Sequence, residues 1–147
     1  MLGDTFNCLI DLAAAEDMMA AWGPWEGGIH PPTTPTELAA MKGNCLLLLG
    51  RFASERAREA AEVLERVHAQ LAPARRSWRA TVLADVGAAY AEQGEIEQAA
   101  QILLSALEQT EQAGVRHNFQ RIAGIRAVHL RGADGPGLRD LDDRLRR

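Results

Sequence analysis

The chain has few lysines, cysteines and aromatic residues, and each shortage excludes some classes of protein. Among 147 residues, Lys42 is the only lysine, Cys8 and Cys45 are the only cysteines, and aromatic side chains make up 5%. Two cysteines far apart in apolar stretches favour buried, reduced thiols over a disulfide or a metal pair, which predicts a cytoplasmic location. There is no apolar run of about 18 residues and no basic leader, so we expect no membrane segment and no export.

Basic charge and catalytic motifs are also lacking. The sequence has 16 basic and 20 acidic side chains and a formal net charge of -4, which argues against direct binding of nucleic acid. It contains no HExxH, no CxxC and no phosphate-binding glycine loop, and no two of its 4 histidines are three or four residues apart. We therefore predict no metal and no cofactor. No motif indicates an enzyme, although a catalytic triad need not be visible in sequence order.

A spaced set of small and aromatic residues is present in the middle of the chain. Its members are Gly87, Tyr90, Gly94, Ala99 and Ala106. These are the intervals of a tetratricopeptide repeat, in which a small residue of the first helix lets the second helix lie close. An aromatic residue then fills the gap, a glycine closes the turn, and two alanines give the second helix a thin face. The spacing predicts a helix-turn-helix unit.

The distribution of glycine, proline and apolar residues predicts about seven helices. We expect them over residues 5–22, 36–49, 53–71, 75–93, 95–113 and 115–131, with a short last helix started by Asp134 and Pro136. Thr36 is the expected N-cap of the second helix, and Gly50 is expected to end it in the left-handed conformation. Four of the six prolines fall within residues 23–35, which excludes a regular element there.

These observations predict an all-α fold in which antiparallel helix pairs form a short, tetratricopeptide-like superhelical stack. We expect a single helical-repeat domain over residues 1–147. Its parts are an N-terminal helix with a proline- and glycine-rich loop (1–35), the repeats (36–131) and a C-terminal capping helix (132–147). Gly50 and Gly94 are 44 residues apart, against about 34 in the standard unit, so the repeat helices should be longer than usual.

Three segments resemble a family of bacterial regulators. They are ELAAMKGNCLLLLGR, ADVGAAYAEQGEIEQAAQILLSALE and the closing LDDRLRR. With them, residues 36–147 resemble the C-terminal tetratricopeptide domains of actinobacterial helix-turn-helix regulators of the XRE family. The resemblance implies a domain that senses a ligand or mediates dimerisation, whereas the DNA-binding half of that family has no counterpart in residues 1–35.

Polar residues interrupt the apolar face of the helix expected over residues 115–131. Arg126 falls in the middle of that face, and His129 and Asn118 lie near its edge. A buried guanidinium needs a carboxylate or carbonyl partner, because an unpaired buried charge costs several kcal/mol. Arg126 could hold an acidic group of a ligand or peptide in a groove, but we favour an internal salt bridge beneath the terminal helix. The candidate partners for that bridge are Asp85, Asp142 and Asp143.

Tryptophans and alanines indicate where a partner could bind. Trp22 and Trp25 lie at the start of the proline-rich stretch, where they either contact a partner or fold back over the groove. Folding back is the interpretation we favour. Ala84 and Ala88 are expected to form groove walls that allow close approach but carry no charge, so a ligand there would be held by shape and apolar contact.

Together these patterns predict a non-enzymatic interaction or sensing module that binds a protein or peptide and is linked to transcriptional regulation. The exposed apolar end of a short stack also favours a homo-oligomer such as a homodimer. The alternative is a small-molecule-binding protein or enzyme whose pocket is enclosed by the helices and the Trp22–Trp25 loop. A partner protein of a toxin-antitoxin or phage system is a third class, for which the sequence has no distinguishing feature.

Overall fold

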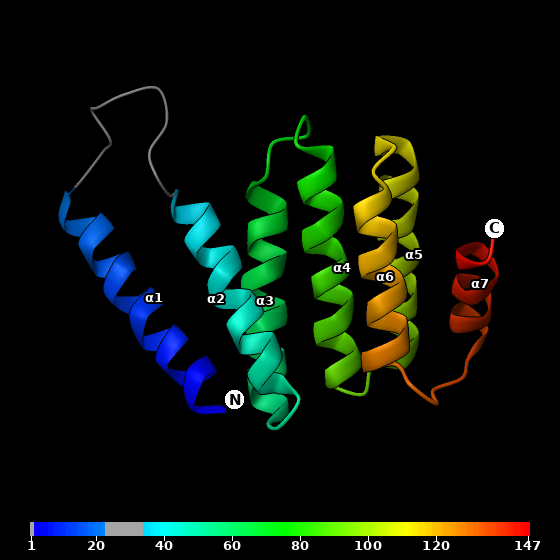
Figure 1. The fold of residues 1–147 in the computed structure, drawn as a ribbon, viewed down its shortest axis with the longest axis horizontal. Helices are drawn as coiled ribbons and strands as arrows, with labels where there is room; N and C mark the ends of the chain where they lie inside the picture. Colours follow the sequence, from blue (N-terminus) through cyan, green and yellow to red (C-terminus); the bar gives the residue numbers. More distant parts are fainter. Residues whose placement is uncertain (1, 23–33) are drawn as a thin grey trace.

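The computed structural model describes residues 2–22 and 34–147, and their side chains except those of residues 2–5, 19 and 22. The described residues form seven helices and no strand. The helices are α1 (Leu2–Trp22), α2 (Pro35–Gly50), α3 (Ser54–Gln70), α4 (Arg76–Glu92), α5 (Ile96–Ala113), α6 (Arg116–His129) and α7 (Pro136–Leu145). Figure 1 shows them arranged from one end of the molecule to the other, with α1 and α7 at opposite ends and α6 overlapping α5. The predicted all-α fold of about seven helices is confirmed.

The α4–α5 hairpin has the close packing that its sequence predicts. A methyl group added to Gly87 on α4 would lie 2.9 Å from the side chain of Leu103 on α5, so only glycine allows this approach. Ala99 and Ala106 are fully buried on the facing side of α5. Gly94 closes the turn with a φ of 81°, in the left-handed region that favours glycine. Each of these roles was predicted and is confirmed.

The α2–α3 hairpin is built in the same way, with one correction. A methyl group on Gly43 would lie 2.5 Å from Leu64, which repeats the relationship between Gly87 and Leu103. Gly50 is not left-handed, contrary to expectation, because the described glycines with positive φ are Gly94, Gly114 and Gly132. Gly50 instead closes the end of α2 against α3, where an added methyl would lie 2.8 Å from the Cβ atom of Ala57.

The start of α2 also differs from the prediction. Thr34, not Thr36, is the N-cap, and its hydroxyl accepts a hydrogen bond from the Glu37 backbone N–H at 3.2 Å. The Glu37 carboxylate accepts the Thr34 N–H at 2.8 Å in return, and Pro35 occupies the first turn. This reciprocal capping box satisfies two N–H groups at once, which explains why the helix begins two residues before the predicted position.

The C-terminal helices are arranged around α5. Both α6 and α7 pack on α5, and α6 also lies along α4. Side chains link α4 to α6 at three levels, between residues that are 36 or 37 positions apart. Because this offset is nearly constant, α6 runs parallel to α4. The main core cluster extends from α2 through these C-terminal helices. Its members include Leu46, Leu103, Leu107, Ile122 and Leu141.

None of the helices in the described part of the chain is sufficiently long and apolar to span a bilayer.

Candidate partner-binding cleft

Asn118 lies in the contact between α4 and α6, not at a groove edge. Its side chain is 1% exposed. The amide nitrogen donates to the Ser77 carbonyl oxygen at 2.8 Å, and the amide oxygen accepts a hydrogen bond from the Thr81 hydroxyl at 2.8 Å. These partners satisfy a buried amide and fix the register of the two helices. The sequence-based assignment of Asn118 to a binding surface is therefore corrected.

His129 is placed in the same α4–α6 contact, one helix length further along. Its Nδ1 atom is hydrogen-bonded to a carboxylate oxygen of Glu92, and both side chains are less than one-fifth exposed. No pattern in the sequence pairs these two residues, because they are 37 positions apart. Through its contact with Glu92, His129 joins α4 and α6.

Arg121 and Asp85 form the third link between α4 and α6. The guanidinium donates from Nε and Nη2 to the two oxygens of Asp85 at 2.8 and 2.7 Å. Asp85 is 2% exposed, and its burial raises the pKa of the carboxyl group, whereas the charge of Arg121 acts in the opposite direction. Asp85 was one of three partners considered for Arg126, but Arg121 occupies it.

Arg126 forms the internal salt bridge that the sequence analysis favoured. Its Nε and Nη2 atoms donate to the two carboxylate oxygens of Asp142 at 2.8 and 2.9 Å. Nη1 donates to the Leu130 carbonyl oxygen at 2.6 Å. The pair connects α6 to α7 directly, and the guanidinium has protein partners on both sides. Arg126 therefore holds the terminal helix in place.

The remaining predicted site residues do not form a groove in the described structure. Ala84 and Ala88 are 1% and 0% exposed and belong to the main core, so they are packing residues and not groove walls. Their small side chains do allow close approach, but of helices and not of a ligand. Trp25 and the side chain of Trp22 lie outside the described residues.

A cleft is present instead where the ends of three helices meet. It has a volume of about 630 Å³ and lies between the C-terminal ends of α5 and α7 and the N-terminal end of α6. Its lining residues are Thr110, Glu111, Gly114, Val115, Arg116, Phe119, Gln120, Leu145 and Arg147. A second hollow, of about 260 Å³, is lined by Pro73, Arg76, Arg79, Gln109 and Gln112 and is smaller. We therefore take the first cleft as the candidate site and call it the C-terminal cleft.

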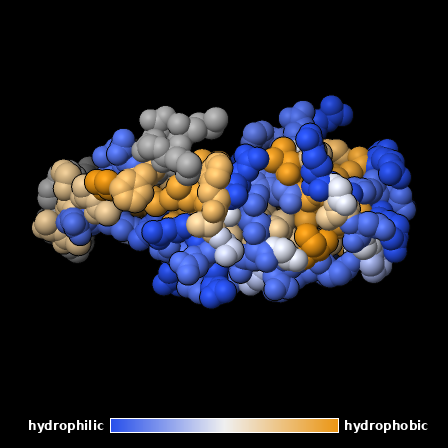
Figure 2. All heavy atoms as spheres, turned by 90° about the horizontal axis from the view of Figure 1, so that it is seen from below, coloured by the Kyte–Doolittle hydropathy of each residue, from blue (hydrophilic) through white to orange (hydrophobic). Residues whose placement is uncertain are grey.

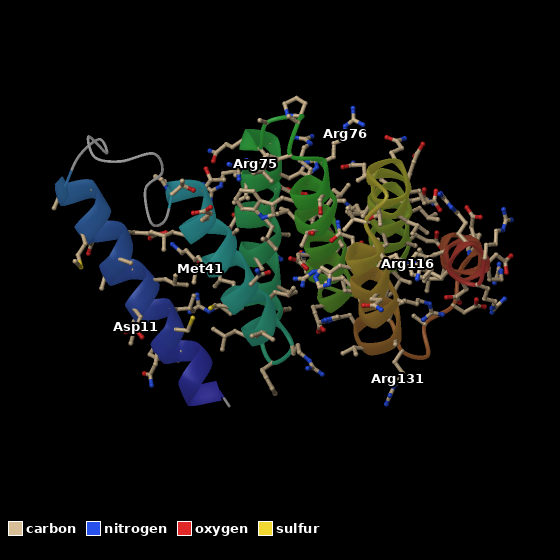
Figure 3. All side chains as sticks on the ribbon, turned by 45° about the horizontal axis from the view of Figure 1, so that its top comes forward. Asp11, Met41, Arg75, Arg76, Arg116 and Arg131 are labelled. Carbon is tan, nitrogen blue, oxygen red and sulfur yellow. The ribbon has the colours of Figure 1, made fainter. Side chains whose placement is uncertain are left out.

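The C-terminal cleft combines an apolar floor with a basic rim. Val115, Phe119 and Leu145 are half-buried and supply apolar surface. Arg116 and Arg147 are exposed on the rim, and Figure 3 shows Arg116 on the side of α6 that faces α7. A cleft with this composition can bind an apolar side chain that is accompanied by a carboxylate.

The acidic residue of the cleft does not cancel this basic character. Glu111 on α5 accepts a hydrogen bond from Arg144 on α7, so its charge already has a partner. The lining residues include no histidine, cysteine or serine, and the hydroxyl of Thr110 donates to the Ala106 carbonyl oxygen at 2.8 Å. The arrangement is suited to binding and holds no nucleophile paired with a base.

Sequence reasoning missed this cleft although it identified some of its parts. Val115 and Phe119 belong to the helix expected over residues 115–131, for which an apolar face was predicted. Arg116 and Arg147 lie 31 residues apart and have no common pattern. Comparison of the chain with protein-family models, curated proteins and solved structures gave no match. The chemistry of the C-terminal cleft is thus the starting point for assigning a function.

Proposed function

We propose that this protein is a non-enzymatic interaction module that binds a segment of a partner protein in the C-terminal cleft. The observation that carries the proposal is the apolar floor formed by Val115, Phe119 and Leu145 beside the exposed guanidinium groups of Arg116 and Arg147. Such a surface selects a segment with apolar residues on one side and aspartate or glutamate beside them. The cleft is open to solvent, which suits a peptide chain better than an enclosed small molecule.

The helix arrangement supports a tetratricopeptide-like stack as the scaffold of this module. Gly43 with Leu64 and Gly87 with Leu103 give two hairpins the same close contact. In addition, α6 repeats the direction of α4, as the first helix of a third unit would, and α7 packs on α5. Stacked helix pairs of this kind commonly present concave surfaces to peptides. We extend the proposal to a sensing role in transcriptional regulation, which the resemblance to XRE-family regulators implies.

The proposal is tested with two synthetic helical peptides of about 16 residues that share a row of leucines. One carries glutamate beside the leucines, and the other carries lysine at the same positions. Fluorescence anisotropy should show micromolar binding of the glutamate peptide and at least about tenfold weaker binding of the lysine peptide. Equal affinity for the two peptides, or binding of neither, would contradict the proposal.

A pair of variants ties this binding to the C-terminal cleft. Replacing Arg116 and Arg147 by glutamate should weaken binding of the glutamate peptide about tenfold and improve binding of the lysine peptide. Arg131→Glu is the matched control, because Arg131 is also exposed but lies at the opposite end of α6 (Figure 3). The control should bind both peptides like the original protein. A similar loss in the control would indicate a general charge effect instead of a site.

A further inference from the structure

The helix at the other end of the molecule has an apolar face that no described part of the chain covers. The inner side of α1 packs on α2 through Leu12 and Cys8, which meet Leu38 and Cys45. On its outer side, Phe6, Ile10 and Met18 are 56%, 55% and 52% exposed. They follow one another at four- and eight-residue intervals and therefore lie in one row along the helix. We call this row the α1 face.

Further large apolar side chains are exposed at the end of the neighbouring helix α2. Leu48 at the end of α2 and Phe52 in the following turn are 53% and 69% exposed. Figure 2, which views the molecule from below, shows apolar side chains gathered across this end of the protein. Single exposed apolar residues are ordinary, but several large ones gathered at one end of a molecule are typical of an interaction surface.

The charged residues of α1 itself are all acidic. Helix α1 contains Asp4, Asp11, Glu16 and Asp17 and no basic residue. Glu16 is paired with Lys42 of α2 at 3.7 Å, whereas Asp11 and Asp17 are exposed beside the apolar row. A helix that presents a row of large apolar side chains with aspartates beside it is the kind of segment that the C-terminal cleft is proposed to bind.

We propose that the C-terminal cleft of one molecule binds the α1 face of a second copy of this chain. In this complex the apolar row of the α1 face packs on the apolar floor of the cleft. Asp11 and Asp17 then come close to the basic rim formed by Arg116 and Arg147. The alternative of two α1 faces packed against each other would bring like charges together and is disfavoured. This inference rests on the proposed function, because it assigns the partner of the same cleft.

A contact of this kind joins two different surfaces and is heterologous. Each pair of molecules retains one free α1 face and one free cleft, so association continues until a ring closes or an open chain grows. The mean mass should therefore rise steadily with protein concentration and fall with added salt. A symmetric dimer, by contrast, would reach a single mass of two chains.

Two variants that each damage one surface test the proposal. Ile10→Lys places a positive charge on the α1 face, and the double variant Arg116→Glu with Arg147→Glu reverses the basic rim. Sedimentation velocity at about 100 μM should show the original protein as oligomers and each variant alone as a monomer. An equal mixture of the two variants should give a discrete dimer, because one contributes an intact cleft and the other an intact α1 face.

Two controls show whether a loss of association comes from damage to the proposed contact, from misfolding or from a general effect of surface charge. Val128→Lys changes an exposed apolar residue of α6 that lies in neither surface, and it should associate like the original protein. Far-UV circular dichroism should show equal helix content in all variants, and the milder Arg116→Gln with Arg147→Gln replaces any variant that does not fold. A monomeric original protein, association of either variant alone, or a mixture that stays monomeric would each overturn the inference.

The peptide experiment distinguishes failure of this inference from failure of the proposed function. A monomeric protein that still binds the glutamate peptide in its C-terminal cleft would overturn self-association alone. An oligomer that is unaffected by the rim variant, together with no peptide binding, would overturn both.

Discussion

Arg126 on α6 and Asp142 on α7 are joined by two parallel hydrogen bonds of 2.8 and 2.9 Å. The pair lies one helical turn from Leu145 and two turns from Phe119, so it fixes α7 beside α6 just below the C-terminal cleft. A planar guanidinium that meets a carboxylate with two donors defines orientation as well as distance. The separation of the cleft walls therefore depends on residues that do not line it.

Breaking this pair should destabilise the protein. Arg126→Ala leaves the carboxylate of Asp142 and the carbonyl of Leu130 without their donor, and we expect a loss of about 2 kcal/mol in the free energy of unfolding. Urea denaturation measures the change, and a cycle with Asp142→Asn and the double variant isolates the pair itself. If the single and double variants are as stable as the original protein, the pair has no structural role.

The two classes of helical glycine should respond oppositely to an added methyl group. Gly87→Ala forces a contact of 2.9 Å with Leu103 and should cost about 1–3 kcal/mol. Gly124→Ala on α6 is the matched control, because nothing lies within 4 Å of its added methyl, and it should stabilise the protein by about 0.5–1 kcal/mol. Thermal unfolding of both variants measures the sign of each change in stability. A stabilised Gly87→Ala would show that the hairpin is not closely packed.

Acid should destabilise the fold through His68. Burial, and then the charge of Arg79, lowers the pKa of this imidazole below its usual value of 6.5. The unfolded chain therefore takes up a proton near pH 6.5 while the folded protein does not, and stability is lost as the pH falls from there toward the lower folded pKa. Urea midpoints measured from pH 7.5 to pH 5 should fall less for His68→Asn than for the original protein. Equal pH dependence of the two proteins would contradict this assignment.

Oxidation should connect α1 to α2. The Sγ atoms of Cys8 and Cys45 are 2.7 Å apart, although the residues are 37 positions apart in sequence. Oxidised glutathione should accept two electrons and two protons from these thiols, which yields one intrachain disulfide and two molecules of glutathione. Because burial raises the pKa of Cys45 to about 12, Cys8 should react first and Cys45 should close the bridge slowly.

Intact-protein mass spectrometry detects the bridge as a loss of two hydrogen masses. The mass of the product should include no attached glutathione. Cys8→Ser removes one partner and should show no such loss. A stable mixed disulfide with glutathione in the original protein, in place of the bridge, would show that the two thiols do not meet in solution.

The sequence by itself determined where the helices lie, because their signals are local. Glycine at position 94 and proline at 136 act on their own backbone, and the apolar period of each helix follows from its own turns. Two predictions about the ends of helix α2 were wrong, and in both cases nearby residues explain the difference. Thr34 was the better cap than Thr36 because Glu37 completes its capping box, and Gly50 serves a close contact with Ala57 and not a left-handed turn.

Only the tertiary structure decided the role of the polar residues. The pattern identified Asn118, Arg126 and His129 as polar groups near an apolar face, and such groups must have partners. Whether the partner is a ligand or another helix depends on which helix packs there. The parallel placement of α6 on α4 brings Glu92 to His129, and the packing of α7 on α5 brings Asp142 to Arg126.

The C-terminal cleft is also a product of helix packing. The cleft exists because the ends of three helices converge. Arg116 and Leu145 both line it, but their separation in the sequence matches no helical or repeat interval. Helix positions follow from interactions within a few residues, whereas a binding surface depends on distances between residues far apart in the chain, and those distances are set by packing.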